Sequence, residues 1–265
     1  MSLYHYTTLN GLLGIVENNS IWATNIYYLN DKNEFEHGRE CLIKTLDCIE
    51  PTFMNENDKK LFLKELEHFS DGGSVNVFSA SFCRTGDKLS QWRGYGGEQG
   101  ICIEFDEDNL FDWVDPEYYN FRKGEVVYLK PGKTIKDHQL IVENLLNNSI
   151  NALLNEDDLF KIVHYEYVIP TIIPFCKDES FHEEDEFRYI FIPADEECIK
   201  FRASDKGLIP YIELQTDKGS NLPIKKIIVG PGKYSEDVIK SLKYFLRHYN
   251  YHDVIVDGSK IPYRG

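Results

Sequence analysis

Residues 78–105 read FSASFCRTGDKLSQWRGYGGEQGICIEF, and this stretch holds the clearest local pattern in the chain. It begins inside the run 75–82 (VNVFSASF), whose apolar residues and alternation are typical of a strand. Residues 87–96 predict a short helix that ends near Gly94. Another strand is expected at 100–106 (GICIEFD). The stretch therefore predicts a strand, a short helix, a glycine-rich turn and a second strand.

Strand and helix patterns alternate along the rest of the chain and predict an α+β fold with a mixed or antiparallel sheet and flanking helices. Further strands are expected at 3–8, 20–25, 125–129, 186–193, 209–214, 224–231 and 253–264. Helices are expected from Leu9 to Val16, from the turn at Asn30 past Leu46, at 57–69 and at 235–249, with a helical insertion at about 135–175. We find no repeat and no linker, so we expect one domain over residues 1–265.

The composition is that of an acidic globular protein. Hydrophobic residues make up 42% of the chain, and the formal net charge is −15. Such a charge repels phosphate backbones and argues against a nucleic-acid partner. We see no apolar run of the ~18 residues that a membrane span needs and no secretion signal. None of the six cysteines forms a CxxC pair, so we expect reduced thiols, a cytoplasmic location and no metal site built from them.

The first candidate site is the opening strand, where a histidine lies between two tyrosines in residues 3–8 (LYHYTT). Successive side chains of a strand point to opposite faces, so Tyr4 and Tyr6 share one face while His5 and Thr7 share the other. The face with the ring nitrogen and the hydroxyl suits a ligand cleft. The alternative is a half-buried histidine that bonds to a neighbouring carbonyl.

The second candidate site is the strand–helix–strand unit. Ser79 and Ser81 place small hydroxyls on one face of its first strand. Ser90, Trp92 and Arg93 follow on the helix. An indole supplies a stacking face, an arginine supplies a bidentate clamp for an anion, and glycines let the backbone approach a ligand closely. The alternative is a core tryptophan beside an ordinary glycine-rich loop.

The third candidate site is the strand at 186–193. Glu186 and Arg188 share one of its faces, and the aromatic residues on the other face are expected to be buried. Charged residues are disfavoured inside strands, so this pair needs a reason. It could be a surface salt bridge or a catalytic carboxylate oriented by a guanidinium. The adjoining segment 182–185 (HEED) could hold a divalent ion, although adjacent residues of an extended chain point apart.

Four segments of the chain together resemble a known family. They are residues 3–38 (LYHYTTLNGLLGIVENNSIWATNIYYLNDKNEFEHG), 81–106 (SFCRTGDKLSQWRGYGGEQGICIEFD), 184–191 (EDEFRYIF) and 259–264 (SKIPYR). They are similar to the bacterial DUF2971 family, a domain family of unknown function. The resemblance extends over essentially the whole chain.

A more distant resemblance suggests an activity. The order of a histidine on an early strand, a strand–helix–strand unit with an aromatic residue, and a glutamate on a late strand is similar to that of ADP-ribosyltransferases of the diphtheria-toxin and poly-ADP-ribose-polymerase type. Those enzymes use a His–Tyr–Glu set. The resemblance implies a split β-sheet core, His5 and Thr7 on the ribose-binding strand, and Glu186 as the catalytic glutamate.

The same resemblance implies a binding site for NAD, in which the segment from Phe78 to Trp92 walls the nicotinamide pocket. No unambiguous tyrosine follows the first strand of that segment, so Trp92, Tyr95 or Tyr28 would take its place. Arg93 or Arg188 would bind the phosphates. The implied cofactor-binding set is Tyr6, Thr7, Tyr28, Ser79, Ser81, Ser90, Trp92, Arg93, Tyr95 and Arg188.

We therefore expect an enzyme that consumes NAD without a metal, as an ADP-ribosyltransferase or an NAD glycohydrolase, in the setting of a bacterial toxin or anti-phage defence effector. The acceptor of the transferred group is open, and no membrane partner is expected. One alternative is a catalytically inactive protein of the same fold that binds a nucleotide or a partner protein. Another is a metal-dependent nucleotide hydrolase or nuclease that uses residues 182–186.

Overall fold

A computed structural model of the chain describes most of its residues. The described residues are 1–29, 33–47, 55–70, 76–97, 99–130, 169, 172–205, 207–217 and 219–262. Most of the expected helical insertion at 135–175 lies outside them.

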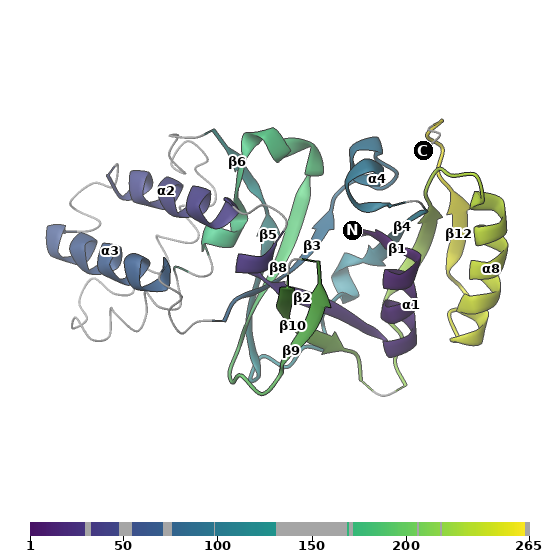
Figure 1. The fold of residues 1–265 in the computed structure, drawn as a ribbon. Helices are drawn as coiled ribbons and strands as arrows, with labels where there is room; N and C mark the ends of the chain where they lie inside the picture. Colours follow the sequence, from purple (N-terminus) through teal and green to yellow (C-terminus); the bar gives the residue numbers. More distant parts are fainter. Residues whose placement is uncertain are drawn as a thin grey trace.

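A large, mostly antiparallel sheet organises the described residues, so the expected α+β class is confirmed (Figure 1). Its ten strands are β1 (Ser2–Thr8), β2 (Ser20–Asn25), β3 (Phe78–Cys83), β4 (Gly100–Asp106), β5 (Tyr119–Glu125), β8 (Glu186–Pro193), β9 (Ile199–Ser204), β10 (Gly207–Gln215), β11 (Ile224–Val229) and β12 (Ile255–Gly258). Within this sheet β11 and β12 run parallel. A separate parallel pair is formed by β6 (Val127–Leu129) and β7 (Cys176–Asp178).

The sheet divides at β3, because β1 and β2 both pair with the same edge of this strand. Along its other edge β3 pairs with β8 over its full length. On the shared edge, Cys83 lies opposite Tyr4 of β1, and Ser79 lies opposite Thr24 of β2. Between them, residues 80–82 have no strand partner on this edge among the described pairings. Two half-sheets therefore diverge from one strand, with β4, β11 and β12 beyond β1 and with β10 and β9 beyond β2.

The helix α1 (Leu9–Asn18) connects the two half-sheets, and its sequence explains both of its ends. The Thr8 hydroxyl accepts a hydrogen bond from the backbone N–H of Gly11 at the start of the helix. At its end Asn19 adopts the left-handed conformation, with φ of 47°. The periodicity at residues 9–16 thus predicted this helix correctly, and its buried side chains, Leu12 and Val16, face the core.

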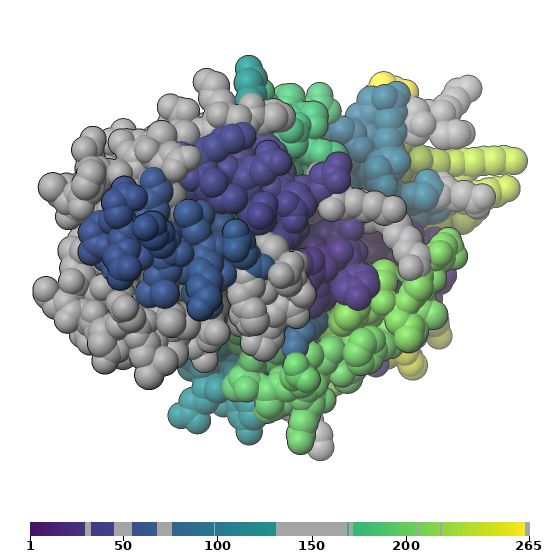
Figure 2. All heavy atoms as spheres, turned by 60° about the vertical axis from the view of Figure 1, so that its left-hand side comes forward, coloured from purple at the N-terminus to yellow at the C-terminus, as the bar shows by residue number. Residues whose placement is uncertain are grey.

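The other α-helices of the described residues flank the sheet. They are α2 (Glu34–Asp47), α3 (Glu56–Ser70), α4 (Leu89–Tyr95) and α8 (Ser235–His248). Figure 1 shows α2 and α3 at one end and α1 with α8 at the other. In the space-filling view α2 and α3 come forward, and β9 and β10 form the green surface below them (Figure 2). None of the helices within the described residues is long and apolar enough to cross a membrane.

The strand β8 is buried on both of its faces. Phe187, Tyr189 and Phe191 belong to the main hydrophobic core, as their alternation predicts. Glu186 and Arg188 lie on the other face, where they are only 6% and 1% exposed. The interpretation of this pair as a surface salt bridge is therefore wrong, and the pair lies instead inside the molecule.

Candidate functional site

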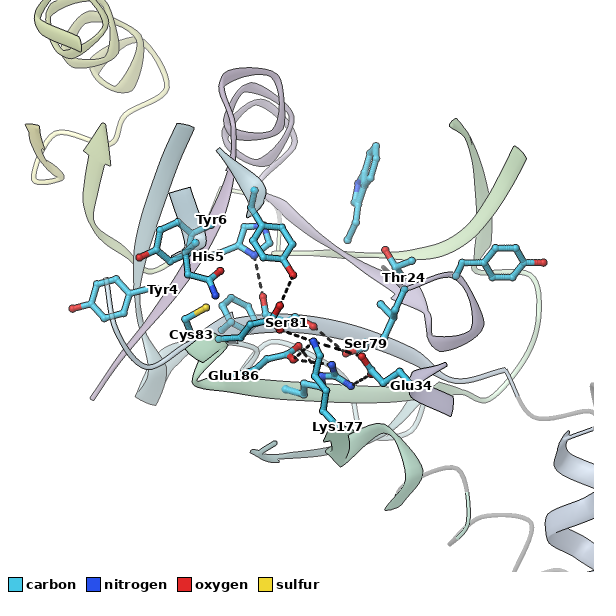
Figure 3. A pocket seen from close by; sticks show the side chains of 18 of the residues that line it. Tyr4, His5, Tyr6, Thr24, Glu34, Ser79, Ser81, Cys83, Lys177 and Glu186 are labelled. Carbon is cyan, nitrogen blue, oxygen red and sulfur yellow. Dashed lines mark hydrogen bonds and ion pairs between the residues drawn. The ribbon is translucent and has the colours of Figure 1, made fainter. Parts of the chain in front are cut away.

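A cavity of about 230 Å³ lies where the sheet divides (Figure 3). Its walls come from β1, β2, β3, β8 and β9 and from segments that cover this side of the sheet. Strand pairing explains why these residues meet. Directly paired residues point to the same face, and Tyr4, Cys83 and Glu186 form one such row across three strands. Thr24 and Ser79 form a second row on that face.

His5 occupies the gap between the half-sheets. Its Nδ1 lies 3.0 Å from the carbonyl oxygen of Ser81, at the part of β3 that has no strand partner on this edge among the described pairings. A carbonyl only accepts, so the proton is assigned to Nδ1 and Nε2 keeps its lone pair. Burial lowers the pKa of His5, and the bond to Ser81 opposes this only in part. The ring is therefore a neutral imidazole at neutral pH.

The floor of the cavity is a buried pair between Glu186 and Arg188. Arg188 donates from Nε to Oε1 and from Nη2 to Oε2 of Glu186, each at 2.7 Å. Nζ of Lys177 donates to the same Oε2 at 3.2 Å. Burial alone would raise the pKa of Glu186, but the charges of Arg188 and Lys177, with the Ser81 hydroxyl, outweigh it and hold this pKa at about 2.

Two further carboxylates complete this charged cluster. Glu34, at the start of α2, pairs with Arg188 and lies 3.6 Å from Nζ of Lys177. Glu184, at the end of the 3₁₀ helix η6 (Glu179–Glu184), accepts from Lys177 at 2.5 Å and from the Tyr95 hydroxyl at 3.1 Å. Burial would lower the pKa of Lys177, but Glu186 and Glu34 raise it well above its ordinary value. Three carboxylates against two cations give the cluster a formal charge of −1.

Most of the residues expected in the site do meet at this cavity. Those that line it are His5, Tyr6, Tyr28, Ser79, Ser81, Tyr95, Glu186 and Arg188. The cavity lies on the tyrosine face of β1, however, and not on the face that His5 shares with Thr7. Thr7 pairs with Ile101 of the main core and does not line the cavity, so the expected face was wrong. The His5 ring contributes only because it lies at the gap.

The short helix α4 carries three residues that the structure places elsewhere. Trp92 is buried against Tyr6 in a small cluster, with ring centroids 4.9 Å apart, and does not line the cavity. Arg93 and Trp92 line a different hollow beside Gly232, and Ser90 lines neither. For Trp92 the core interpretation is therefore correct. Of the three aromatic residues expected to stack on nicotinamide, Tyr28 and Tyr95 line the cavity.

The glycines near α4 accommodate this tryptophan. A Cβ on Gly100 would lie 2.9 Å from Cε3 of Trp92, and one on Gly230 would lie 3.0 Å from the same atom. The indole N–H donates to Asp87 at 2.9 Å. Asp87 also accepts from the Ser259 hydroxyl at 2.5 Å and from the backbone N–H of Lys260 at 2.8 Å. The glycine-rich turn thus packs around a side chain.

Several lining residues were not named individually as site residues from the sequence. They are Tyr4, Trp22, Thr24, Leu29, Glu34, Phe82, Cys83, Gln91, Lys177, Glu184 and Arg202. Phe82, Cys83 and Gln91 nevertheless belong to the segment from Phe78 to Trp92 that was expected to wall the pocket, and Glu184 belongs to the acidic segment considered for a metal. Tyr4 and Thr24 could have been found from strand alternation once the correct face was chosen. Glu34 and Lys177 gave no local signal, because each is one charge in a polar segment.

The acidic segment 182–185 shows no metal-like arrangement. Glu184 is held by Lys177, and Asp185 accepts from the Thr85 hydroxyl at 2.9 Å. Nδ1 of His182 lies 2.9 Å from the carbonyl of Glu179. Across the part of the chain that the structure describes, no group of three His, Cys, Asp or Glu side chains is placed to hold a metal ion.

Comparison with protein families gives one match. Residues 91–189 match the model of DUF2971, described as a protein of unknown function. The expected resemblance to this family is thereby confirmed on a segment that includes Glu186, Arg188 and Lys177. No match to the chain was found among curated proteins or among solved structures.

Proposed function

We propose that the protein consumes NAD, transferring its ADP-ribosyl group to an acceptor or to water. The observation that carries this proposal is the meeting of His5 and Glu186 at one cavity, in the gap of a divided sheet. The two residues are far apart in the sequence. The resemblance implied His5 on the ribose-binding strand and Glu186 as the catalytic glutamate. The cavity of about 230 Å³ lies below the usual ligand-pocket range of about 300–1,000 Å³, so it would take only part of the substrate, such as the ribose that reacts.

The charges of the cavity suit the bond that would break. When nicotinamide leaves, positive charge develops on the ribose. A fixed carboxylate stabilises that charge where it appears, and the cluster around Glu186 carries three carboxylates against two cations. The low pKa of Glu186 keeps this carboxylate ionised at neutral pH.

The remaining contacts would position the sugar. The unprotonated Nε2 of His5 accepts a hydrogen bond from one ribose hydroxyl. A second ribose hydroxyl donates a hydrogen bond to Glu186 and replaces the one from the Ser81 hydroxyl. Tyr28 or Tyr95 stacks on the nicotinamide and holds its leaving direction.

A second candidate function is nucleotide binding without turnover. It is favoured by the bonds on Glu186, because both of its oxygens already accept from Arg188 and one also accepts from Lys177. A carboxylate offers about four acceptor positions, so these bonds leave little room for substrate. In this candidate function Glu186 stabilises the fold, and the cavity binds a nucleotide without breaking any of its bonds.

Nicotinamide release from NAD by the purified full-length chain separates the two candidates. For the enzyme we expect steady release, reduced about a hundredfold or more by Glu186→Gln. Glu213→Gln is the matched control, because Glu213 is also a strand carboxylate paired with a cation, Lys200, but does not line the cavity. It should release nicotinamide at the wild-type rate.

The melting temperature with and without NAD gives the second readout. Stabilisation by NAD without any nicotinamide release, tested with protein and small-molecule acceptors present, would favour the binding protein. If NAD neither stabilises the protein nor is cleaved, both candidates are contradicted. Equal rates for wild type and a folded Glu186→Gln variant would remove Glu186 from the mechanism.

A further inference from the structure

One part of the cavity wall is built from β2 and β9 and contains an arginine that the sequence reasoning did not consider. Arg202 pairs with Ile209 of β10, and Thr24 pairs with Tyr211, two residues further along β10. Alternate residues of a strand share a face, so Arg202 lies on the same face of the sheet as Thr24 and Trp22. All three side chains line the cavity.

Its contacts hold the Arg202 guanidinium in place. Its central carbon lies over the Trp22 ring, 5.7 Å from the centroid. Trp22 in turn packs against Tyr211, with centroids 4.3 Å apart. Nη2 of Arg202 donates to the Thr24 hydroxyl at 3.2 Å. A planar cation is thereby fixed at the cavity wall by an indole and one neutral hydroxyl.

Arg202 differs from the other cations of the cavity in its partners. Lys177 and Arg188 are each paired with carboxylates. Among the described residues Arg202 has no carboxylate within ion-pair distance, and its Nε is buried without a hydrogen-bond partner. Within the part of the chain that the structure describes, its charge is therefore not neutralised by a carboxylate. Buried donors without a protein partner are rare in native structures, so this Nε can donate to an oxygen of a bound ligand.

We propose that Arg202, held by Trp22 and Thr24, is a phosphate subsite of this cavity and binds the diphosphate of the nucleotide. The inference rests on the proposed function for the identity of that nucleotide. Guanidinium groups bind phosphate oxygens through two parallel hydrogen bonds, and a site that lacks a carboxylate partner does not compete with the ligand.

The same charges fix the direction in which the nucleotide lies. Glu34, Glu184 and Glu186 repel phosphate, so the diphosphate takes the wall of β2 and β9 and the ribose that reacts takes the side of Glu186. Arg188 does not serve the phosphates, because its three nitrogens already bond to Glu186, Glu34 and the Pro174 carbonyl. Arg93 lines a different hollow.

The test compares the binding of ADP and adenosine by titration calorimetry, since the two ligands differ only in the diphosphate. Wild type is expected to bind ADP at least tenfold more tightly than adenosine, and Arg202→Gln is expected to abolish this preference. Lys200→Gln is the matched control, because Lys200 lies on the same strand and face but outside the cavity. It should keep the preference.

Two further variants keep the test decisive. Arg202→Lys keeps the charge without the planar fork and should retain part of the preference. Thr24→Val, which removes the hydroxyl that orients the guanidinium, should weaken ADP binding severalfold and by a larger factor than adenosine binding. An unchanged ADP preference in folded Arg202→Gln, or no ADP preference in wild type, would overturn the inference.

Nicotinamide release by the same variants distinguishes this inference from the proposed function. Arg202-dependent ADP binding without any NAD turnover would contradict the enzyme and support the subsite. If the protein turns over NAD and the KM for NAD is the same in Arg202→Gln as in wild type, the enzyme is supported and the subsite is overturned. If the proposed NAD turnover and the phosphate subsite are both correct, we expect Arg202→Gln to raise the KM for NAD at least tenfold with a smaller change in kcat.

Discussion

Nδ1 of His5 lies 3.0 Å from the carbonyl oxygen of Ser81, so a side chain makes the hydrogen bond that a neighbouring strand would otherwise make on this edge of β3. The half-sheets that begin at β1 and β2 can diverge there without leaving this partly buried carbonyl unpaired. His5 is therefore both a structural link and a wall of the cavity.

His5→Ala should destabilise the fold by about 1–2 kcal/mol, because the partly buried Ser81 carbonyl loses its hydrogen-bond partner. Urea denaturation at neutral pH measures the change in the free energy of unfolding. His252→Ala is the control, because His252 is exposed at the surface. Equal stability of the two variants would contradict the structural role of His5.

Glu186 should make the fold sensitive to acid. Its pKa is lowered from 4.5 to about 2 in the folded protein, so the ionised carboxylate stabilises the fold above about pH 4.5. This contribution of about 3 kcal/mol is lost as the pH falls from about 4.5 to about 2. Free energies of unfolding, measured by urea at several pH values, should show wild type and Glu186→Gln converging as the pH falls through this range.

The convergence is specific to this buried carboxylate. Glu236→Gln, at an exposed position of α8, is the control and should differ from wild type by less than about 1 kcal/mol. A constant difference between wild type and Glu186→Gln across the acidic range would show that the Arg188 pair contributes no pH-dependent stability.

Arg188→Met should be among the most damaging single changes. Arg188 is 1% exposed and pairs with both Glu186 and Glu34, so its loss leaves two buried carboxylates with Lys177 alone. Removing one partner of a buried ion pair typically destabilises a protein by about 3–5 kcal/mol. Differential scanning calorimetry should show a large fall in the melting temperature.

The double variant Glu186→Gln/Arg188→Met tests the pairing directly. It should be more stable than the sum of the two single effects predicts, with a coupling of about 1–3 kcal/mol. Lys200→Met is the comparison at an ion pair that is 54% exposed on the lysine side, where an effect below about 1 kcal/mol is expected. Additive effects of the two cavity variants would contradict the pairing.

Two glycines near α4 form a matched pair for the packing around Trp92. A Cβ on Gly100 would lie 2.7 Å from Cα of Gly96 and 2.9 Å from the indole, so Gly100→Ala should destabilise the fold by about 1–3 kcal/mol. Gly94 lies in the helix with nothing within 4 Å of its Cβ position. Gly94→Ala should be neutral or stabilising by up to about 1 kcal/mol. The melting temperatures of the two variants should therefore move in opposite directions or differ clearly.

Strand alternation predicted much of the fold and the central part of the site. The apolar patterns of β3, β4 and β8 appear as expected, and alternation along β8 correctly separated Glu186 and Arg188 from the aromatic face. The strands β5 and β9 were not predicted, although apolar and polar residues alternate at 119–122 and along Ile199–Ser204. Arg202 was missed for this reason, because it lies on β9.

The cavity itself could not be predicted in full, because its charges come from distant segments. Glu34 and Arg188 are 154 residues apart, and nothing in the sequence around Glu34 marks it as buried. Thr7 shows the opposite error. Thr7 shares a face of β1 with His5, as expected, but this face turns toward the core. His5 reaches the cavity only because its ring lies at the gap beside β3.

Asp87 lies beside the Trp92 indole and is joined to Lys260 across 173 residues of chain. Most of this polypeptide must therefore emerge from the ribosome before Trp92 and its neighbours can acquire all of their native bonds. Pairings between distant segments make folding slow. We expect the region around Asp87 to mature last during refolding, and a chain cut before Ser259 to expose the tryptophan that the complete fold conceals.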